Sequence, residues 1–268
     1  MKVAFFGGTF DPVHRGHLAV ARAAADRFGL DRIYFAPADI PPHKQKRRLT
    51  DFQHRFAMLA LATADDPRFV PSLLDANIGQ PNYSIFTVRR LKSTLKKTDK
   101  LYFLIGMDAF KDIATWRQPE DLLAECDFIV ASRPGFALNH VYRALPQSLQ
   151  PSPAMQRSLH GPRGGHGIGR AQENGHVALP GVMVHLLPDL HERVSSTQIR
   201  AAARKSVKQL SRLVPAPVAE YIRKERLYVS QNAAQNAATE KEAGHPGKVL
   251  SLNRGAPLNQ DAPRGRRS

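Results

Sequence analysis

The chain has 268 residues, 42% of them hydrophobic, and a formal net charge of +16, which allows one sizeable domain or two small ones and favours phosphorylated or other polyanionic partners. Its single cysteine, Cys126, excludes an internal disulfide and a cysteine-based zinc cluster. No apolar run approaches the roughly 20 residues of a membrane span, and no signal-peptide pattern precedes the first predicted strand, so we expect a cytoplasmic protein without a membrane partner.

The first predicted unit is a strand, a glycine turn and a helix. Residues 3–6 form a short apolar run that ends at Gly7 and Gly8, and an alanine-rich helical pattern follows. His14 and His17, three residues apart at the start of that helix, share one face. The glycines let the backbone approach a ligand closely, and the helix N-terminus offers N–H groups and a partial positive charge. This arrangement predicts a phosphate-binding site.

The twelve residues 7–18, GGTFDPVHRGHL, resemble the signature of the HxGH nucleotidyltransferases, and the GGTFDPVH form resembles that of the bacterial nicotinate-nucleotide adenylyltransferases. The resemblance implies that His14 and His17 bind the α- and β-phosphates of ATP in the transition state, with Thr9 assisting. The other residues that it places at the ATP site in this motif are Gly7, Gly8 and Phe10.

A second strand is predicted at residues 31–37, and a strand, a helix and a strand in this short space form a βαβ unit with a parallel sheet. We therefore expect a Rossmann-like α/β fold, an open parallel sheet with helices on both faces. A loop reading Pro-Pro-His-Lys follows at residues 41–44. It is either a solvated basic loop or, as the resemblance implies, the place where His43 and Lys44 approach the phosphates when nicotinate mononucleotide binds.

Residues 82–87, Asn-Tyr-Ser-Ile-Phe-Thr, lead into another predicted helix. In the family that the chain resembles, this segment lines the nicotinate pocket with a hydroxyl and backbone amides. The resemblance gives the same role to Ser84, Ile85 and Thr87. For Thr87, simple capping of the helix is an equal alternative.

The clearest buried strand, residues 101–106, ends at Gly106, where the missing side chain permits close approach of a base or sugar. Asp108 follows at the edge of the sheet, where it can accept ribose hydroxyls or help orient a metal. The resemblance implies that Trp116, the only tryptophan, stacks on the nicotinate ring and that the Arg117 amide holds the ring carboxylate. For Trp116, packing in the core is the alternative.

Two later segments also match the family. A strand at residues 128–132 leads into Arg133, which the resemblance places near the adenine. Residues 194–200, VSSTQIR, resemble the second signature of the family: Ser and Thr at a helix start can coordinate a phosphate, and an arginine fork suits phosphate oxygens. The residues implied to grip the β- and γ-phosphates are Ser196, Thr197 and Arg200.

We expect residues 1–228 to form one nucleotidyltransferase domain. Within it, residues 137–180 are rich in glycine and proline and predict a flexible insertion. Its histidines are irregularly spaced, which argues against a metal site there. Residues 229–268 are rich in Gln, Asn, Ala, Gly, Pro and Arg, a composition typical of a disordered tail, here a basic one.

The resemblance implies transfer of AMP from ATP to nicotinate mononucleotide, which gives nicotinate adenine dinucleotide and pyrophosphate. A substrate-bound Mg²⁺ is expected, held largely by phosphate oxygens and water, so the protein needs no dedicated set of metal ligands. Nicotinamide mononucleotide or pantetheine phosphate as acceptor, a non-catalytic nucleotide-binding protein, and a basic RNA- or membrane-binding protein are the alternatives. We expect no nucleic-acid partner, because no binding module accompanies the charge. The oligomeric state, including a homo-oligomer, stays open.

Overall fold

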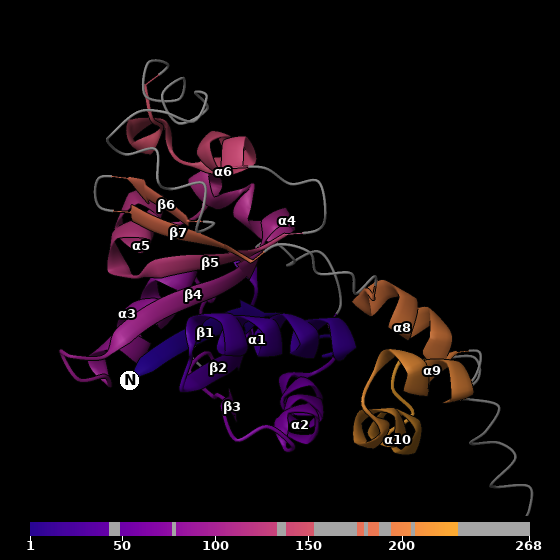
Figure 1. Ribbon diagram of the computed structural model, residues 1–268. Helices are drawn as coiled ribbons and strands as arrows, with labels where there is room; N and C mark the ends of the chain where they lie inside the picture. Colours follow the sequence, from indigo (N-terminus) through magenta and orange to yellow (C-terminus); the bar gives the residue numbers. More distant parts are fainter. Residues whose placement is uncertain are drawn as a thin grey trace, which may run out of the picture. The chain divides into compact units, whose positions relative to one another are not determined.

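A single sheet forms the centre of the computed structural model, which describes residues 1–42, 49–76, 79–132, 138–152, 176–179, 182–187, 194–204 and 207–229. Met1–Tyr228 form one compact unit. The strand order is β3-β2-β1-β4-β5-β7-β6 (Figure 1). The strands are β1 (Lys2–Gly8), β2 (Arg32–Pro37), β3 (Phe69–Pro71), β4 (Lys100–Gly106), β5 (Asp127–Ala131), β6 (His176–Leu179) and β7 (Val182–Leu187). Neighbours from β3 to β7 pair in parallel, and β6 pairs antiparallel with β7.

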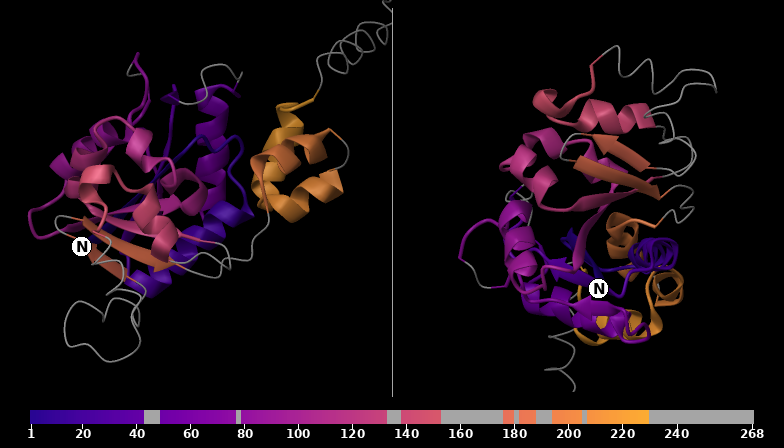
Figure 2. Two further views of the ribbon diagram at one scale, coloured as in Figure 1. Left: turned by 90° about the horizontal axis from the view of Figure 1, so that it is seen from above. Right: turned by 60° about the vertical axis from the view of Figure 1, so that its left-hand side comes forward.

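Helices cover both faces of this sheet, as the right-hand view of Figure 2 shows. Side chains alternate along a strand, so Ala4 and Phe6 of β1 enter one core and Val3 and Phe5 enter the other. The first core takes residues from α1 (Arg15–Phe28), α2 (Phe52–Thr63), α8 (Ser196–Ala203), α9 (Val207–Leu213) and α10 (Ala216–Lys224). The second takes them from α3 (Ser84–Ser93), α4 (Met107–Phe110), the 3₁₀ turn η2 (Ile113–Thr115), α5 (Pro119–Glu125) and α6 (Leu138–Ala144). The predicted Rossmann-like α/β fold is confirmed.

Two elements lie inside the segment 137–180, which the sequence predicted as an insertion without regular structure. These are α6, which is followed by the 3₁₀ turn η3 (Gln147–Leu149), and the edge strand β6. Val141 and Leu145 are buried against the second core, so tertiary packing stabilises a helix too short to leave a clear periodic pattern. The strand β6 pairs with β7 through backbone hydrogen bonds, which place few demands on its sequence. Residues 153–175 of the insertion and residues 230–268 of the predicted tail lie outside the described part of the chain.

A buried arginine holds together the loops at the carboxyl end of the sheet. Arg55 of α2 is only 1% exposed. Its guanidinium donates to the carbonyl oxygens of Thr50 (2.7 Å), Thr9 (2.9 Å), Ala38 (2.7 Å) and Asp39 (3.4 Å). The loops after β1 and β2 are thereby tied to one side chain, although burial lowers the pKa of the Arg55 guanidinium. No helix in the described ranges is long and apolar enough to cross a membrane.

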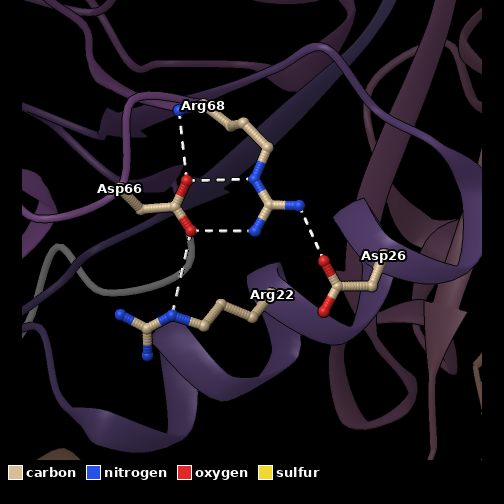
Figure 3. Close-up of polar contacts among 4 residues, drawn as sticks. All are labelled: Arg22, Asp26, Asp66 and Arg68. Carbon is tan, nitrogen blue, oxygen red and sulfur yellow. Dashed lines mark hydrogen bonds and ion pairs between the residues drawn. The ribbon is translucent and has the colours of Figure 1, made fainter.

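A second arginine cluster joins the entry of β3 to α1 on the surface (Figure 3). Arg68 donates to Asp66 from its backbone N–H (3.1 Å), Nε (3.0 Å) and Nη2 (2.9 Å), and from Nη1 to Asp26 (2.7 Å). Arg22 Nε lies 3.8 Å from Asp66 Oδ2. The hydrogen bonds from Arg68 lower the pKa of Asp66. Asp66 is buried, but Arg22, Asp26 and Arg68 are partly exposed, so solvent screens their charges and the cluster stabilises the fold less than Arg55 does.

We expect Arg55→Met to reduce the free energy of unfolding by about 3 kcal/mol, because buried carbonyl oxygens lose their donors. Arg22→Met is the matched control, since its guanidinium is half exposed, and should cost less than about 1 kcal/mol. Urea unfolding of the two variants measures both values. Equal losses would contradict the role given to Arg55.

Candidate active site

The carboxyl ends of β1, β4 and β5 surround a cavity of about 280 Å³. The strand order reverses direction between β1 and β4, and open α/β sheets bind ligands at such a switch point. The cavity is lined by Phe6, Gly7, His14, Gly16, His17, Ala19, Val20, Gly106, Met107, Asp108, Ala131, Ser132 and Val194. Four of the residues predicted at the ATP site, and Asp108, are therefore brought together here.

The two histidines cap α1 reciprocally. His14 is the N-cap residue, and its Nδ1 accepts from the backbone N–H of His17 (3.3 Å). In return, His17 Nδ1 accepts from the backbone N–H of His14 (3.2 Å). The two rings stack with centroids 3.6 Å apart. The sequence placed both imidazoles in the first helical turn, and the structure instead puts His14 one residue before it.

This capping fixes the proton positions of both rings. A ring nitrogen that accepts an N–H bond carries no proton, so the neutral rings bear theirs on Nε2. Burial also lowers the pKa of His14 from 6.5 to about 4. At neutral pH His14 is therefore an uncharged ring with its proton on Nε2, and both rings line the cavity next to the N–H groups of a helix start. That combination is suited to phosphate oxygens.

Phe10 holds His17 from the other side. Its backbone has φ 45°, a left-handed conformation that is costly for a bulky residue. Its ring is 2% exposed and meets the rings of His17 (5.0 Å), Phe6 (5.6 Å) and Phe35 (5.9 Å) edge-on or tilted. Phe10 thus packs beneath the phosphate-binding turn.

The glycines of the site differ in what they do. A Cβ on Gly7 would meet the Phe5 ring at 2.8 Å, and one on Gly8 would meet the Phe10 ring at 3.2 Å. These two positions stay small because aromatic rings lie against them. A Cβ on Gly106 would meet no atom within 4 Å. A side chain there would project into open space at the cavity, so the glycine leaves room for a ligand.

The second predicted signature lies against the first. Ser196 Oγ donates to the Pro12 carbonyl (3.1 Å), and Arg200 Nη1 donates to the Asp11 carbonyl (2.6 Å). Arg200 Nη2 also donates to Thr197 Oγ1 (3.0 Å). The structure therefore brings the predicted β- and γ-phosphate ligands to the turn that precedes α1.

Two residues that the sequence analysis did not single out complete this contact. The Tyr228 hydroxyl donates to Asp11 Oδ1 (2.8 Å), and the Asp11 side chain is buried. Burial, followed by the charge of Asp11, raises the pKa of Tyr228, which keeps the hydroxyl protonated as a donor. The short segment that follows α10 is thereby joined to the predicted phosphate-binding turn.

A second, smaller cavity of about 70 Å³ lies between the loop after β2 and the start of α3. Its lining is Pro42, Asn82, Tyr83, Ser84, Trp116, Arg117 and Leu122. The structure therefore brings together Ser84, Trp116 and Arg117. Ile85 and Thr87 are fully buried, and the Thr87 hydroxyl donates to Asp75 Oδ1 (2.5 Å). Thr87 thus faces the interior, behind the cavity rather than in its lining. His43, Lys44 and Arg133 lie outside the described residues.

Comparison with known proteins identifies the family. The cytidylyltransferase-like family model matches residues 5–202. A probable nicotinate-nucleotide adenylyltransferase of Citrifermentans bemidjiense is 36% identical over 233 residues, which cover 85% of this chain and 99% of the relative. The chain belongs to the nicotinate-nucleotide adenylyltransferase family. A member from Moorella thermoacetica, also named probable, is 35% identical over 227 residues, 85% of this chain and 91% of the relative.

The fold is shared with a solved structure. Nicotinic acid mononucleotide adenylyltransferase of Plasmodium falciparum, complexed with NaAD, superposes with a TM-score of 0.61 at 17% identity, covering 85% of this chain and 97% of that chain. Such low identity supports the fold alone. In the described part of this family member, no group of three or more His, Cys, Asp or Glu residues is arranged to hold a metal ion.

The reciprocal cap predicts a pH-dependent stability. The unfolded chain takes up the His14 proton below pH 6.5, and the folded chain does so only near pH 4. The contribution of neutral, buried His14 to the free energy of unfolding is therefore fully present above pH 6.5. It decreases by about 3 kcal/mol as the pH falls toward 4. His14→Asn keeps an N-cap acceptor without a titratable ring. The difference in unfolding free energy between wild type and variant should change by this amount over that range, and a constant difference would contradict the account.

Proposed function

We propose that this protein transfers AMP from ATP to nicotinate mononucleotide, giving nicotinate adenine dinucleotide and pyrophosphate in NAD biosynthesis. The observation that carries the proposal is the pair of stacked imidazoles at the start of α1, which line a cavity at the switch point of the sheet. Family membership supports the choice of reaction, because its members are named for it. The reaction takes place in the cytoplasm under this proposal.

The reaction needs little covalent chemistry from the protein. The phosphate of the mononucleotide is ionised at neutral pH, so it attacks the α-phosphorus of ATP without a general base. The bond to the β-phosphate oxygen breaks, and pyrophosphate leaves with the electron pair. Positioning and charge stabilisation then dominate. The Nε2–H groups of His14 and His17 donate to the α- and β-phosphates, and Thr9 assists from the turn that Arg55 holds.

The second signature supplies the β- and γ-phosphate contacts. Arg200 and Ser196 now donate to backbone carbonyls of the first signature, so they lie within reach of the same turn. When ATP binds, they and Thr197 turn to its terminal phosphates. Mg²⁺, when bound, neutralises phosphate charge. It is held by phosphate oxygens and water, with the Asp108 carboxylate at the cavity wall as the protein group best suited to it.

The small cavity receives the nicotinate ring. Trp116 offers a stacking surface, and the first N–H groups of α3, from Ser84 and Ile85, have no partner within the helix. The Arg117 amide and these groups hold the ring carboxylate, and Asp108 accepts ribose hydroxyls. His43 and Lys44 bind the acceptor phosphate, and Arg133 lies near the adenine. The Arg117 guanidinium, 6.0 Å from the centre of the Tyr83 ring, favours an acid over its amide.

Pyrophosphate release tests the acceptor directly. The purified protein, ATP and Mg²⁺ are assayed in parallel with nicotinate mononucleotide, nicotinamide mononucleotide or pantetheine phosphate. A strong preference for nicotinate mononucleotide is expected. Comparable rates with both mononucleotides would contradict selection by the carboxylate. Release only with pantetheine phosphate, or none with any acceptor, would overturn the proposed reaction.

We expect His17→Ala to lower kcat by about 100-fold or more, because a donor to the developing phosphate charge is lost. His185→Ala is the matched control. Its imidazole pairs with Asp127 (3.2 Å), and it is not among the residues that line the cavity. The control should change kcat less than about twofold. Thermal unfolding establishes that both variants fold, and a folded His17→Ala enzyme with near-normal kcat would contradict the role of His17.

A further inference from the structure

One buried side chain joins the two walls of the acceptor cavity. Asn82 is only 6% exposed. Its backbone N–H donates to the Ile40 carbonyl (2.9 Å), and its Oδ1 accepts from the Ile40 N–H (2.6 Å). Its Nδ2 donates to the Asp75 carbonyl (2.9 Å). The side-chain amide of Asn82 therefore accepts a hydrogen bond from the backbone of one loop and donates one to the backbone of another.

Asp75 is itself fixed to α3. Its carboxylate is 4% exposed, and Oδ1 accepts the Thr87 hydroxyl at 2.5 Å. Arg90, one turn further along α3, approaches the same oxygen at 3.8 Å. A buried carboxylate needs such partners, because an unpaired charge would be costly there. A continuous series of hydrogen bonds therefore connects α3 to the loop after β2. It runs from Thr87 to Asp75, from Asp75 to Asn82 and from Asn82 to Ile40.

Both walls of the cavity begin at this network. On one side, Pro42 lies two residues after Ile40 and lines the cavity. On the other, Asn82 itself lines the cavity, together with Tyr83 and Ser84, which directly follow it. The distance between the two walls therefore depends on the Ile40–Asn82 hydrogen bonds.

We propose that Asn82 is a positioning residue that sets the width of the acceptor cavity and so determines affinity for the aromatic ring of the acceptor. This inference rests on the proposed function, since it concerns the acceptor of that reaction. The side-chain hydrogen bonds of Asn82 join Ile40 of the loop after β2 to Asp75, beside the acceptor cavity, so we expect an effect on one of the two substrates only. The buried Thr87 hydroxyl supports the same network, because it holds the Asp75 carboxylate behind the cavity.

The test is the separation of the two Michaelis constants. Asn82→Ala should raise KM for nicotinate mononucleotide by about tenfold, because hydrogen bonds to both loops are lost. KM for ATP should change by less than about twofold. Asn82→Asp keeps the acceptor for the Ile40 N–H but sets a buried carboxylate oxygen against the Asp75 carbonyl, so it should raise KM for the mononucleotide at least as much as alanine does. Binding of the mononucleotide alone, measured by calorimetry, should weaken in the same order.

Thr63→Val is the matched control, because Thr63 is also buried and its hydroxyl donates to the Leu59 carbonyl (2.9 Å) at the far end of α2. It should leave both Michaelis constants unchanged. An unchanged KM for the mononucleotide in a folded Asn82→Ala enzyme would overturn the inference. Equal increases in both Michaelis constants would do so too, since they indicate a general loss of structure. A wild-type enzyme that releases no pyrophosphate with this acceptor would instead contradict the proposed function.

Discussion

The reciprocal hydrogen bonds between His14 and His17 are the constraint on which the rest of the site depends. Nδ1 of each ring accepts a hydrogen bond from the backbone N–H of the other residue. These two bonds cap α1 and orient both Nε2–H groups. The side chains that cap α1 are therefore the same ones that we propose as donors to phosphate. Because His14 is buried, it stays neutral at physiological pH, so under the proposed function it meets a phosphate through a directed hydrogen bond and not as a cation.

The surrounding residues all act on the turn between β1 and α1. Arg55 binds the Thr9 carbonyl from α2, and Arg200 and Ser196 bind the next carbonyls from α8. Tyr228 holds the Asp11 carboxylate from beyond α10. Elements from widely separated parts of the sequence thus converge on three residues of this turn, Thr9, Asp11 and Pro12. Such support keeps a strained turn in one conformation, as the left-handed Phe10 requires.

Local pattern predicted much of this fold and part of the site. The parallel order of β1 and β2 followed from one βαβ unit, and the two signatures indicated the phosphate-binding turn and the start of α8. The supporting contacts could not be predicted, because they join residues far apart in sequence. Asp11 and Tyr228 are 217 residues apart, and Asn82 and Ile40 are 42 apart. Arg55 did leave a signal, a charge on the apolar face of α2 among Phe52, Met58 and Leu59. The burial of Thr87 and the bond from its hydroxyl to Asp75 were likewise not predicted, because Asp75 lies in a different loop.

The protonation state of the histidine pair tests the central claim most directly. Nuclear magnetic resonance of the protein labelled with ¹⁵N at histidine reports which ring nitrogen carries the proton. The structure predicts the Nε2–H tautomer for both His14 and His17 at pH 7, with His14 remaining neutral until the pH approaches 4. A proton on Nδ1 of either ring, or titration of His14 near its ordinary value of 6.5, would contradict the reciprocal cap and the phosphate site built on it.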